Sequence, residues 1–169
     1  HNPHYKEWFM QESSHIQNVI GAEQVYRLSH IGSTAVEGIR AKAIVDILLE
    51  LKNDCDSATV KEKLIADGWI VMQELVAPEF KISLNKGYTA GGFDERVYHL
   101  HIRYQGDWDE LYYCDYLNAN PGAAKEYEAL KQELAMQYRF NREAYTEAKT
   151  DFIKKHTQIA REKFSGRYK

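Results

Sequence analysis

Cysteine is scarce in this chain of 169 residues, and so are long apolar runs and any large excess of charge of one sign. Cys55 and Cys114 stand far apart and outside any Cys-x-x-Cys pair, which argues against a disulfide scaffold or a thiolate zinc site. No apolar stretch approaches the ~20 residues that cross a bilayer, so we expect no membrane partner. With 22 Lys+Arg against 25 Asp+Glu, the net charge of −3 does not predict a nucleic-acid partner either.

The composition is that of a globular protein, with 44% hydrophobic and 28% charged residues. A chain of this length buries roughly 70% of its unfolded surface, which suffices for a core without covalent cross-links. We therefore expect one domain over residues 1–169, with an α/β front to about residue 106 and a helical back over 107–169. We also expect no signal peptide, and hence a cytoplasmic location. The sequence defines no oligomeric state.

Hydrophobic periodicity predicts an α+β fold. In the front part it indicates helices over 5–20 and 56–67, and strands over 25–31, 43–51, 69–76, 80–84 and 96–104. The glycine-rich segment 85–94 is expected to be a turn or mobile loop. Strand signals stop after residue 107, and three helices are expected in the rest of the chain. The first covers about 108–118, the second begins at 123, and the third runs from an Asn141 cap to about 164.

Asp46 is the strongest candidate for a functional residue. It lies at the centre of the apolar run 43–51, which is typical of a strand buried on both faces. Burying an unpaired carboxylate is costly, so this acid needs a metal ion, a cation or a site open to water. A salt bridge to Lys42 or Arg40 is the structural alternative, and we favour the functional role.

Gly32, Ser33 and Thr34 follow the expected strand 25–31 and precede Asp46. A strand that ends in Gly-Ser and turns into a helix offers backbone N–H groups and a hydroxyl to a phosphate. An acid on a neighbouring strand can hold the divalent cation that neutralises this phosphate. The alternative is that Ser33 and Thr34 only cap a helix.

His99 and His101 alternate in the expected strand 96–104, so both imidazoles project from one face. Beside the Asp46 strand they would complete a set of two imidazoles and one carboxylate, which suits zinc, manganese or iron better than magnesium. The alternative is a buried polar network in which the histidines hydrogen-bond Asp46 or tyrosine hydroxyls. His30 lies close enough to Ser33 in the sequence to join either arrangement.

The helical third contributes Lys149, which shares a helical stripe with Tyr145. An unpaired lysine rarely faces a core, so Lys149 is expected either to bind an anionic ligand or to pair with Asp46 or Glu50. Tyrosines on such a stripe are more often core residues with a solvated hydroxyl than a base-stacking platform. Arg142 is either a surface residue or a phosphate contact.

Motifs spread along the chain resemble those of the GrpB family. They are His30-Ile31-Gly32-Ser33-Thr34-Ala35-Val36, Ala41-Lys42, Val45-Asp46-Ile47-Leu48, Tyr98-His99-Leu100-His101-Ile102, Asp115-Tyr116-Leu117, Tyr127-Glu128-Ala129-Leu130-Lys131, Arg142, Tyr145 and Lys149. Ala43, Cys114 and Asn141 depart from the family pattern, which has proline, arginine and an acid there. The family is similar to the nucleotidyltransferase superfamily, so the resemblance implies a mixed sheet of four to five strands, helices packed against it and a helical C-terminal third.

The resemblance also implies a metal-dependent nucleotidyltransferase. Gly32, Ser33 and Thr34 would hold the phosphates of a nucleoside triphosphate, Asp46 would hold Mg²⁺ or Mn²⁺, and Lys42 or Lys149 would offset phosphate charge. The implied partner is a nucleotide or a phosphorylated small molecule, and the acceptor is not defined.

The acid pair that such enzymes carry is incomplete in this chain. Nucleotidyltransferases of this fold place a second acid two residues after the first, roughly 6.5–7 Å away on the same strand face. Here that residue is Leu48, and Glu50 lies ~13 Å along the strand. Two alternatives therefore stay open, namely a protein that binds a nucleotide or phosphometabolite without catalysis, and a transition-metal-dependent protein that uses His99, His101 and Asp46.

Overall fold

The structure is a computed structural model that describes residues 2–169. The described chain forms five strands, five α-helices and two short 3-10 helices, which is the α+β fold that the sequence predicts. It divides into two compact units, one made of 2–35 with Ala41–Gly106 and the other of Val36–Arg40 with Asp107–Lys169. A single domain over the whole chain stays a prediction.

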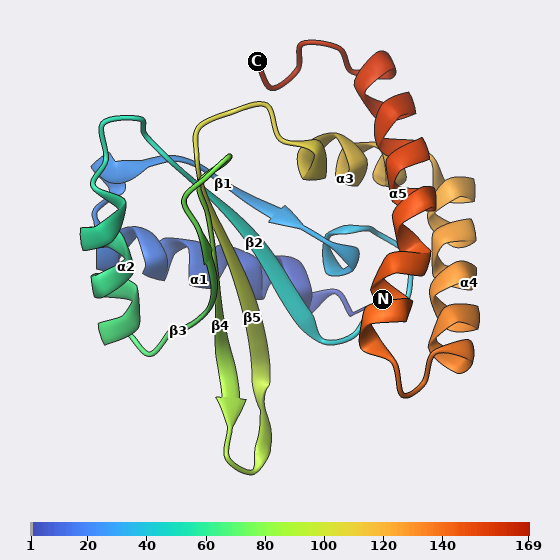
Figure 1. Ribbon diagram of the computed structural model, residues 1–169, viewed down its shortest axis with the longest axis horizontal. Coiled ribbons are helices and arrows are strands. Elements are labelled where there is room, and N and C mark those ends of the chain that lie inside the picture. The colour runs from blue at the N-terminus through green and yellow to red at the C-terminus, as the bar shows by residue number, and fades with distance from the viewer. Residues whose placement is uncertain (1) are drawn as a thin grey trace. The chain divides into compact units, whose positions relative to one another are not determined.

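The first unit is built on a five-stranded sheet with strand order β1-β2-β5-β4-β3 (Figure 1). The strands are β1 (Val25–Ile31), β2 (Ile44–Leu51), β3 (Ile70–Leu75), β4 (Lys81–Thr89) and β5 (Gly92–Tyr104). Strands β2 and β5 pair in parallel, and every other neighbouring pair is antiparallel. The parallel pair places β5 directly beside β2, although three elements separate the two strands in the sequence.

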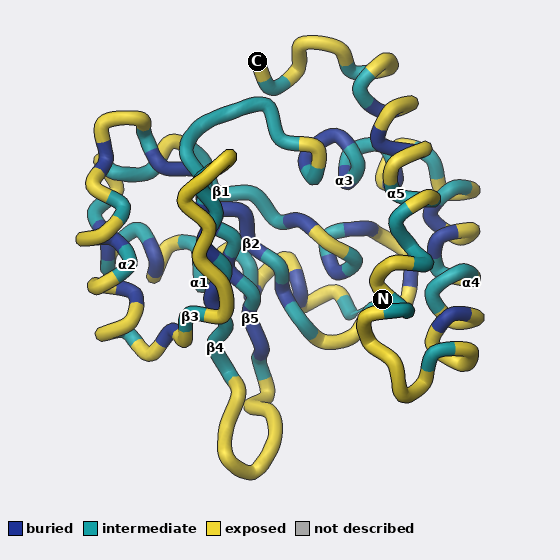
Figure 2. The backbone as a smooth tube through the Cα atoms, viewed as in Figure 1, coloured by how far each residue is buried: buried dark blue, intermediate teal, exposed yellow. Residues whose placement is uncertain are grey.

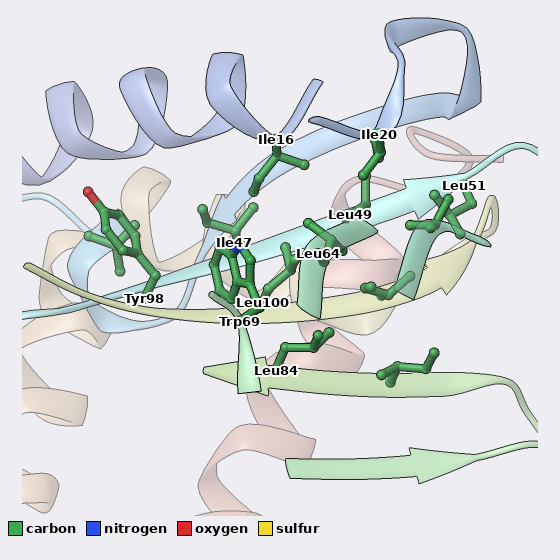
Figure 3. Packing of buried hydrophobic residues seen from close by; sticks show 14 of the residues in the cluster. Ile16, Ile20, Ile47, Leu49, Leu51, Leu64, Trp69, Leu84, Tyr98 and Leu100 are labelled. Carbon is green, nitrogen blue, oxygen red and sulfur yellow. The ribbon is translucent and has the colours of Figure 1, made fainter. Parts of the chain in front are cut away.

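One face of this sheet packs on α1 (His4–Ile20) and α2 (Ser57–Ala66). The core between them contains the residues seen in Figure 3: Ile16, Ile20, Ile47, Leu49, Leu51, Leu64, Trp69, Leu84, Tyr98 and Leu100. Because successive side chains of a strand point to opposite faces, this packing turns Asp46, Leu48 and Glu50 of β2 away from the two helices. The candidate site residues of β2 therefore lie on the face opposite the helices.

The segment 85–94 is a β-hairpin: the predicted turn is present but short, and most of the segment is strand instead of a mobile loop. Strand β4 continues to Thr89 and β5 begins at Gly92, so only two residues form the turn. Gly87 interrupts the β pattern with a φ of 94°, where the pairing of β4 with β5 is irregular. Figure 2 shows the tip of this hairpin as exposed.

The second unit contains α3 (Asp109–Ala119), α4 (Pro121–Gln137) and α5 (Arg142–Lys163), close to the expected bounds. The Asn141 side chain accepts a hydrogen bond from the Ala144 N–H at 3.0 Å, which confirms the predicted cap of α5. The segment 36–40 joins this unit because the Arg40 N–H donates to the Glu128 carboxylate at 2.8 Å. Among residues 2–169, no helix has both the length and the apolar character needed to span a membrane.

Candidate functional site

Asp46 and two histidines meet on the sheet face that is turned away from α1 and α2. The parallel register places His99 beside Asp46 and His101 beside Leu48. Asp46 Oδ1 lies 3.4 Å from His99 Nδ1 and 3.3 Å from His101 Nε2. The side chains keep exposed fractions of 25% for Asp46, 19% for His99 and 31% for His101. The site is thus polar, convergent and open to water.

The Asp46 carboxyl is held in its ionised form. Burial acts to raise its pKa, but hydrogen bonds and charge attraction from His101 and His99 outweigh burial, so the pKa of Asp46 lies below its usual value. An ionised carboxylate only accepts hydrogen bonds, so the ring nitrogens that face it, His99 Nδ1 and His101 Nε2, each carry a hydrogen. The three groups form the polar network that was the alternative to a metal site.

Gly32 lies directly against the Asp46 carboxylate. Its φ is 72°, and a Cβ at this position would lie 2.5 Å from Asp46 Oδ2. Glycine is therefore required both by the backbone conformation and by the close approach. The contact places the end of β1 and the start of the short 3-10 helix η2 (Ser33–Ala35) beside Asp46.

Thr34 and His30 hold this loop from the helix side of the sheet. The buried Thr34 hydroxyl donates to the Ile44 carbonyl at 3.0 Å and accepts from His30 Nε2 at 2.9 Å. His30 pairs with Ile47 across the strands, and its ring stacks on Phe9. Burial lowers the pKa of His30 to about 4, against the opposing charge of Asp46. His30 therefore lies on the other face of the sheet from the Asp46 carboxylate.

Glu50 is fully buried and does not join Asp46. Arg27 binds it through two nitrogens, with Nη2 at 2.9 Å from Oε1 and Nε at 2.5 Å from Oε2. The Gly106 N–H donates to the same Oε1 at 3.1 Å. A carboxylate with a bidentate guanidinium and a backbone donor is neutralised within the fold. The sequence analysis missed Arg27, which pairs with Glu50 across β1 and β2.

The acid pair is incomplete in the structure as well. Leu48 occupies the position two residues after Asp46 and is fully buried. Lys42, which the sequence suggested as a salt-bridge partner of Asp46, is exposed. Asp46 is paired with the two histidines instead. The donors at Asp46 are consequently one carboxylate and two imidazoles.

This donor set fits a divalent transition metal by its chemistry. Imidazole and carboxylate together suit zinc, manganese or iron, whereas magnesium prefers oxygen ligands. In the structure each histidine donates separately to Oδ1, so a cation would take the place of the two ring hydrogens and draw the three donors together.

Three other side chains come closer together than the Asp46 set. Within the described range 2–169, the group whose ligand atoms all lie within 4.8 Å of one another is Glu12, His15 and Asp67. Lys86 Nζ lies 2.9 Å from the Glu12 carboxylate and 3.1 Å from the Asp67 carboxylate. The ammonium group already supplies the positive charge there, so this cluster is an ion-pair network.

In the helical unit, Lys149 lies with its ammonium 4.5 Å from the centre of the Tyr145 ring. Arg142 is exposed at the first turn of α5. Tyr145 and Lys149 both belong to the helical stripe that the sequence predicts. A role of Arg142, Tyr145 or Lys149 in phosphate binding stays a prediction.

Lys131 is a cation that the sequence analysis named only within a family motif. Its ammonium lies 4.9 Å from the centre of the Tyr127 ring and donates to the Arg40 carbonyl at 3.3 Å. Burial, followed by repulsion from Lys149, lowers the pKa of Lys131 to about 8, although Glu128 acts in the opposite direction. Two ammonium groups that repel each other favour an anion nearby.

The chain has the nucleotidyltransferase-like fold. It is similar to the crystal structure of Cid1 poly (U) polymerase with Mg and 3′-dATP bound, at a TM-score of 0.52 and 13% identity, over 84% of this chain and 48% of that one. At this identity the likeness shows the fold alone.

Within this fold the chain belongs to the GrpB family, whose model, described as GrpB protein, matches residues 1–159. The glutamate-rich protein GrpB of Alkalihalophilus pseudofirmus is 35% identical over 156 residues, which are 90% of this chain and 88% of that protein. The crystal structure of the conserved protein GrpB from Enterococcus faecalis matches with a TM-score of 0.83 and 26% identity, over 97% of this chain and 96% of that one. The resemblance found in the sequence is confirmed.

Proposed function

We propose that this protein binds a nucleoside triphosphate together with a divalent cation at Asp46 and transfers a nucleotidyl group to an acceptor. The observation that carries the proposal is the contact between Gly32 and Asp46. At this contact the exposed Gly32 and the partly exposed Ser33, whose backbone N–H groups are donors for phosphate oxygens, lie directly beside an ionised carboxylate. Membership of the GrpB family and the nucleotidyltransferase-like fold support the proposal.

Each residue has a defined task in this reaction. Gly32 and Ser33 bind phosphate oxygens, and Asp46, His99 and His101 hold the cation. The cation supplies charge neutralisation for the phosphates, and the two imidazoles favour manganese or zinc for that position. Lys42, exposed just before β2, offsets further phosphate charge. Positioning and charge stabilisation make up most of the catalytic task in such a transfer.

A second candidate function is binding of a nucleotide or phosphometabolite without transfer. The fully buried Leu48 favours it, because the second metal-binding acid of the nucleotidyltransferases would stand there. A single carboxylate can hold one cation for a bound phosphate, but a two-metal transfer needs more oxygen ligands.

Calorimetric titration of the metal-stripped protein tests both functions. ATP, GTP, CTP and UTP are each titrated with magnesium, manganese or zinc into the wild type, Asp46→Asn and Asp54→Asn. Asp54 is an exposed acid of the same unit, so Asp54→Asn is a matched control for the loss of one charge. We expect metal-dependent nucleotide binding in the wild type and the control, and at least tenfold weaker binding in Asp46→Asn.

The outcomes separate the candidates. Pyrophosphate release in the presence of water or an added alcohol, either of which takes the nucleotidyl group, supports transfer if the release is lost in Asp46→Asn, and binding without release supports the second candidate. Metal binding without nucleotide binding contradicts both and supports a transition-metal protein that uses His99, His101 and Asp46. Absence of both kinds of binding refutes a ligand site at Asp46.

A further inference from the structure

The β4–β5 hairpin brings a tyrosine to the Asp46 site. Tyr88 Oη lies 2.8 Å from His99 Nε2, and the two rings are nearly parallel, at an interplanar angle of 13°. The other nitrogen of the same ring, Nδ1, faces Asp46 Oδ1 at 3.4 Å. A continuous chain of contacts therefore runs from the Tyr88 hydroxyl through His99 to the Asp46 carboxylate.

Gly87 makes this arrangement possible. Lys86 points to the helix side of the sheet, where it pairs with Glu12 of α1. In a regular strand Tyr88, two residues further on, would point to that same side. The left-handed conformation of Gly87, with φ at 94°, interrupts the alternation and lets Tyr88 reach His99 on the opposite face.

The contact of Nδ1 with Asp46 determines which nitrogen of His99 carries the hydrogen. Because Nδ1 donates to the ionised Asp46, Nε2 of the neutral ring is an acceptor, and the Tyr88 hydroxyl donates to it. If Nδ1 binds a cation instead, the hydrogen must lie on Nε2, and the Tyr88 oxygen then accepts. A hydroxyl satisfies both states without moving, because it is both a donor and an acceptor.

We propose that Tyr88 is a positioning residue that holds the His99 ring with Nδ1 directed at Asp46 in both the cation-free and the cation-bound state. Only the part of this inference that concerns the cation-bound state rests on the proposed function. The hydrogen bond between Tyr88 and His99 is present in the structure itself. Partners of this kind, on the distal nitrogen of a ligating histidine, contribute about 10–100-fold to metal affinity.

The test compares Tyr88→Phe with Tyr26→Phe. Tyr26 lies partly exposed on β1 of the same unit, so its variant controls for the loss of one hydroxyl from the sheet. Zinc alone and manganese alone are titrated into each metal-stripped protein. Imidazole ¹⁵N spectra of the metal-free proteins are recorded at alkaline pH. The ¹⁵N shifts report directly which nitrogen carries the hydrogen.

We expect the wild type and Tyr26→Phe to show His99 as one tautomer, with the hydrogen on Nδ1. In Tyr88→Phe the His99 ring is no longer held with Nδ1 directed at Asp46, so we expect this variant to show a mixture of the two tautomers and to bind zinc or manganese about 10–100-fold more weakly. A purely structural role of Tyr88 would leave the tautomer unchanged.

The failure of this inference is distinct from failure of the proposed function. If the wild type binds no cation, the cation site is refuted, while the ¹⁵N spectrum still decides the role of Tyr88 in the free protein. An unchanged spectrum and unchanged affinity in Tyr88→Phe overturn the inference and leave the cation site standing.

A second pair of variants tests whether the conformation of Gly87 brings Tyr88 to His99. A Cβ at Gly87 would lie 2.2 Å from the Arg96 carbonyl oxygen, whereas a Cβ at Gly68, whose φ of 95° is nearly the same, would meet nothing within 4 Å. Gly87→Ala should therefore displace Tyr88 and reproduce the ¹⁵N spectrum of Tyr88→Phe, and Gly68→Ala should keep the wild-type spectrum. Identical spectra from both glycine variants contradict the proposed role of the irregular pairing.

Discussion

Strand β2 carries two carboxylates on one face, and their surroundings differ at its two ends. Glu50 is fully buried and bound by Arg27 and the Gly106 N–H. Asp46 keeps a quarter of its side chain exposed and is held by two longer contacts from histidines. The Glu50 end is closed and neutralised by the Arg27 guanidinium, whereas the Asp46 end is partly open to solvent and contacted by two imidazole rings.

The difference shows that the partners of an acid within an apolar strand decide whether its carboxylate is fully occupied or keeps an oxygen for a ligand. Burial of a charge requires a partner, and a guanidinium that fills both oxygens leaves no position for a ligand. Two imidazoles that share one oxygen leave the other oxygen, Oδ2, facing the loop at Gly32. Position within the strand alone does not distinguish the two acids.

The largest effect is expected from removal of the buried acid. Glu50→Ala should lower the free energy of unfolding by about 3–5 kcal/mol, because it leaves the Arg27 guanidinium without its partner. Asp46→Asn should cost less than about 1 kcal/mol, because its site is partly solvated and its contacts are long. Urea denaturation followed by circular dichroism measures both.

A double variant checks the cause. Arg27→Met with Glu50→Leu removes both charges and should recover most of the stability lost in Glu50→Ala, since an apolar pair of similar volume replaces the ion pair. Equal losses in Glu50→Ala and Asp46→Asn would show that the two ends of β2 do not differ as described.

An intermediate effect is expected at Gly32. Gly32→Ala and Gly38→Ala both place alanine at a positive φ, 72° and 79°, which costs roughly 1–2 kcal/mol. A Cβ at Gly38 meets nothing within 4 Å, whereas at Gly32 it would lie 2.5 Å from Asp46 Oδ2. Gly32→Ala should therefore be the less stable variant by thermal and urea unfolding, and it should also lose cation binding. Equal stability and full binding in both variants would rule out a tight contact between Gly32 and Asp46.

The smallest effect is a dependence of stability on pH that arises on the helix side of the sheet. Burial lowers the pKa of His30 from 6.5 to about 4, so between these values the unfolded chain binds more protons than the folded one. Stability should fall as the pH is lowered from about 6.5 to about 4, and should be independent of this group above that window. The lowered pKa of Asp46 acts only at more acid pH, where its stabilising contribution is lost as the carboxylate is protonated.

His30→Gln isolates this contribution. The amide can still donate to Thr34 but does not titrate, so the variant should have a flatter stability profile across that window when urea midpoints are compared. A profile that keeps the wild-type slope would show that His30 is protonated as easily in the folded protein as in the unfolded chain.

Much of the fold follows from the sequence because its strands have clear patterns. The apolar run around Asp46 and the alternation of His99 and His101 predict two strands with these side chains on defined faces, and the structure pairs the strands in a register that brings the three together. Whether they bind a ligand stays a prediction. Gly32 was predicted from the sequence to offer its backbone N–H group to a phosphate, but its contact with Asp46 depends on tertiary packing.

The sequence analysis missed two features for physical reasons. Tyr88 was overlooked because Gly87 breaks the two-residue period that marks a strand, so the segment resembled a loop. The partnership of Arg27 with Glu50 depends on the antiparallel register of β1 and β2, which hydrophobic periodicity alone does not define.

The parallel pairing of β2 with β5 makes the Asp46 site depend on contacts between residues that are distant in the sequence. Asp46 and His101 lie 55 residues apart in the sequence, whereas Ile31, beside Gly32, pairs with Asp46 through a much shorter loop. Closing the longer loop costs more chain entropy, so we expect β5 to pair with β2 after β1 does. A nascent chain with only the β1–β2 pair carries the carboxylate and the glycine loop but neither imidazole. The three polar side chains at Asp46 therefore come together only when β2 and β5 have paired.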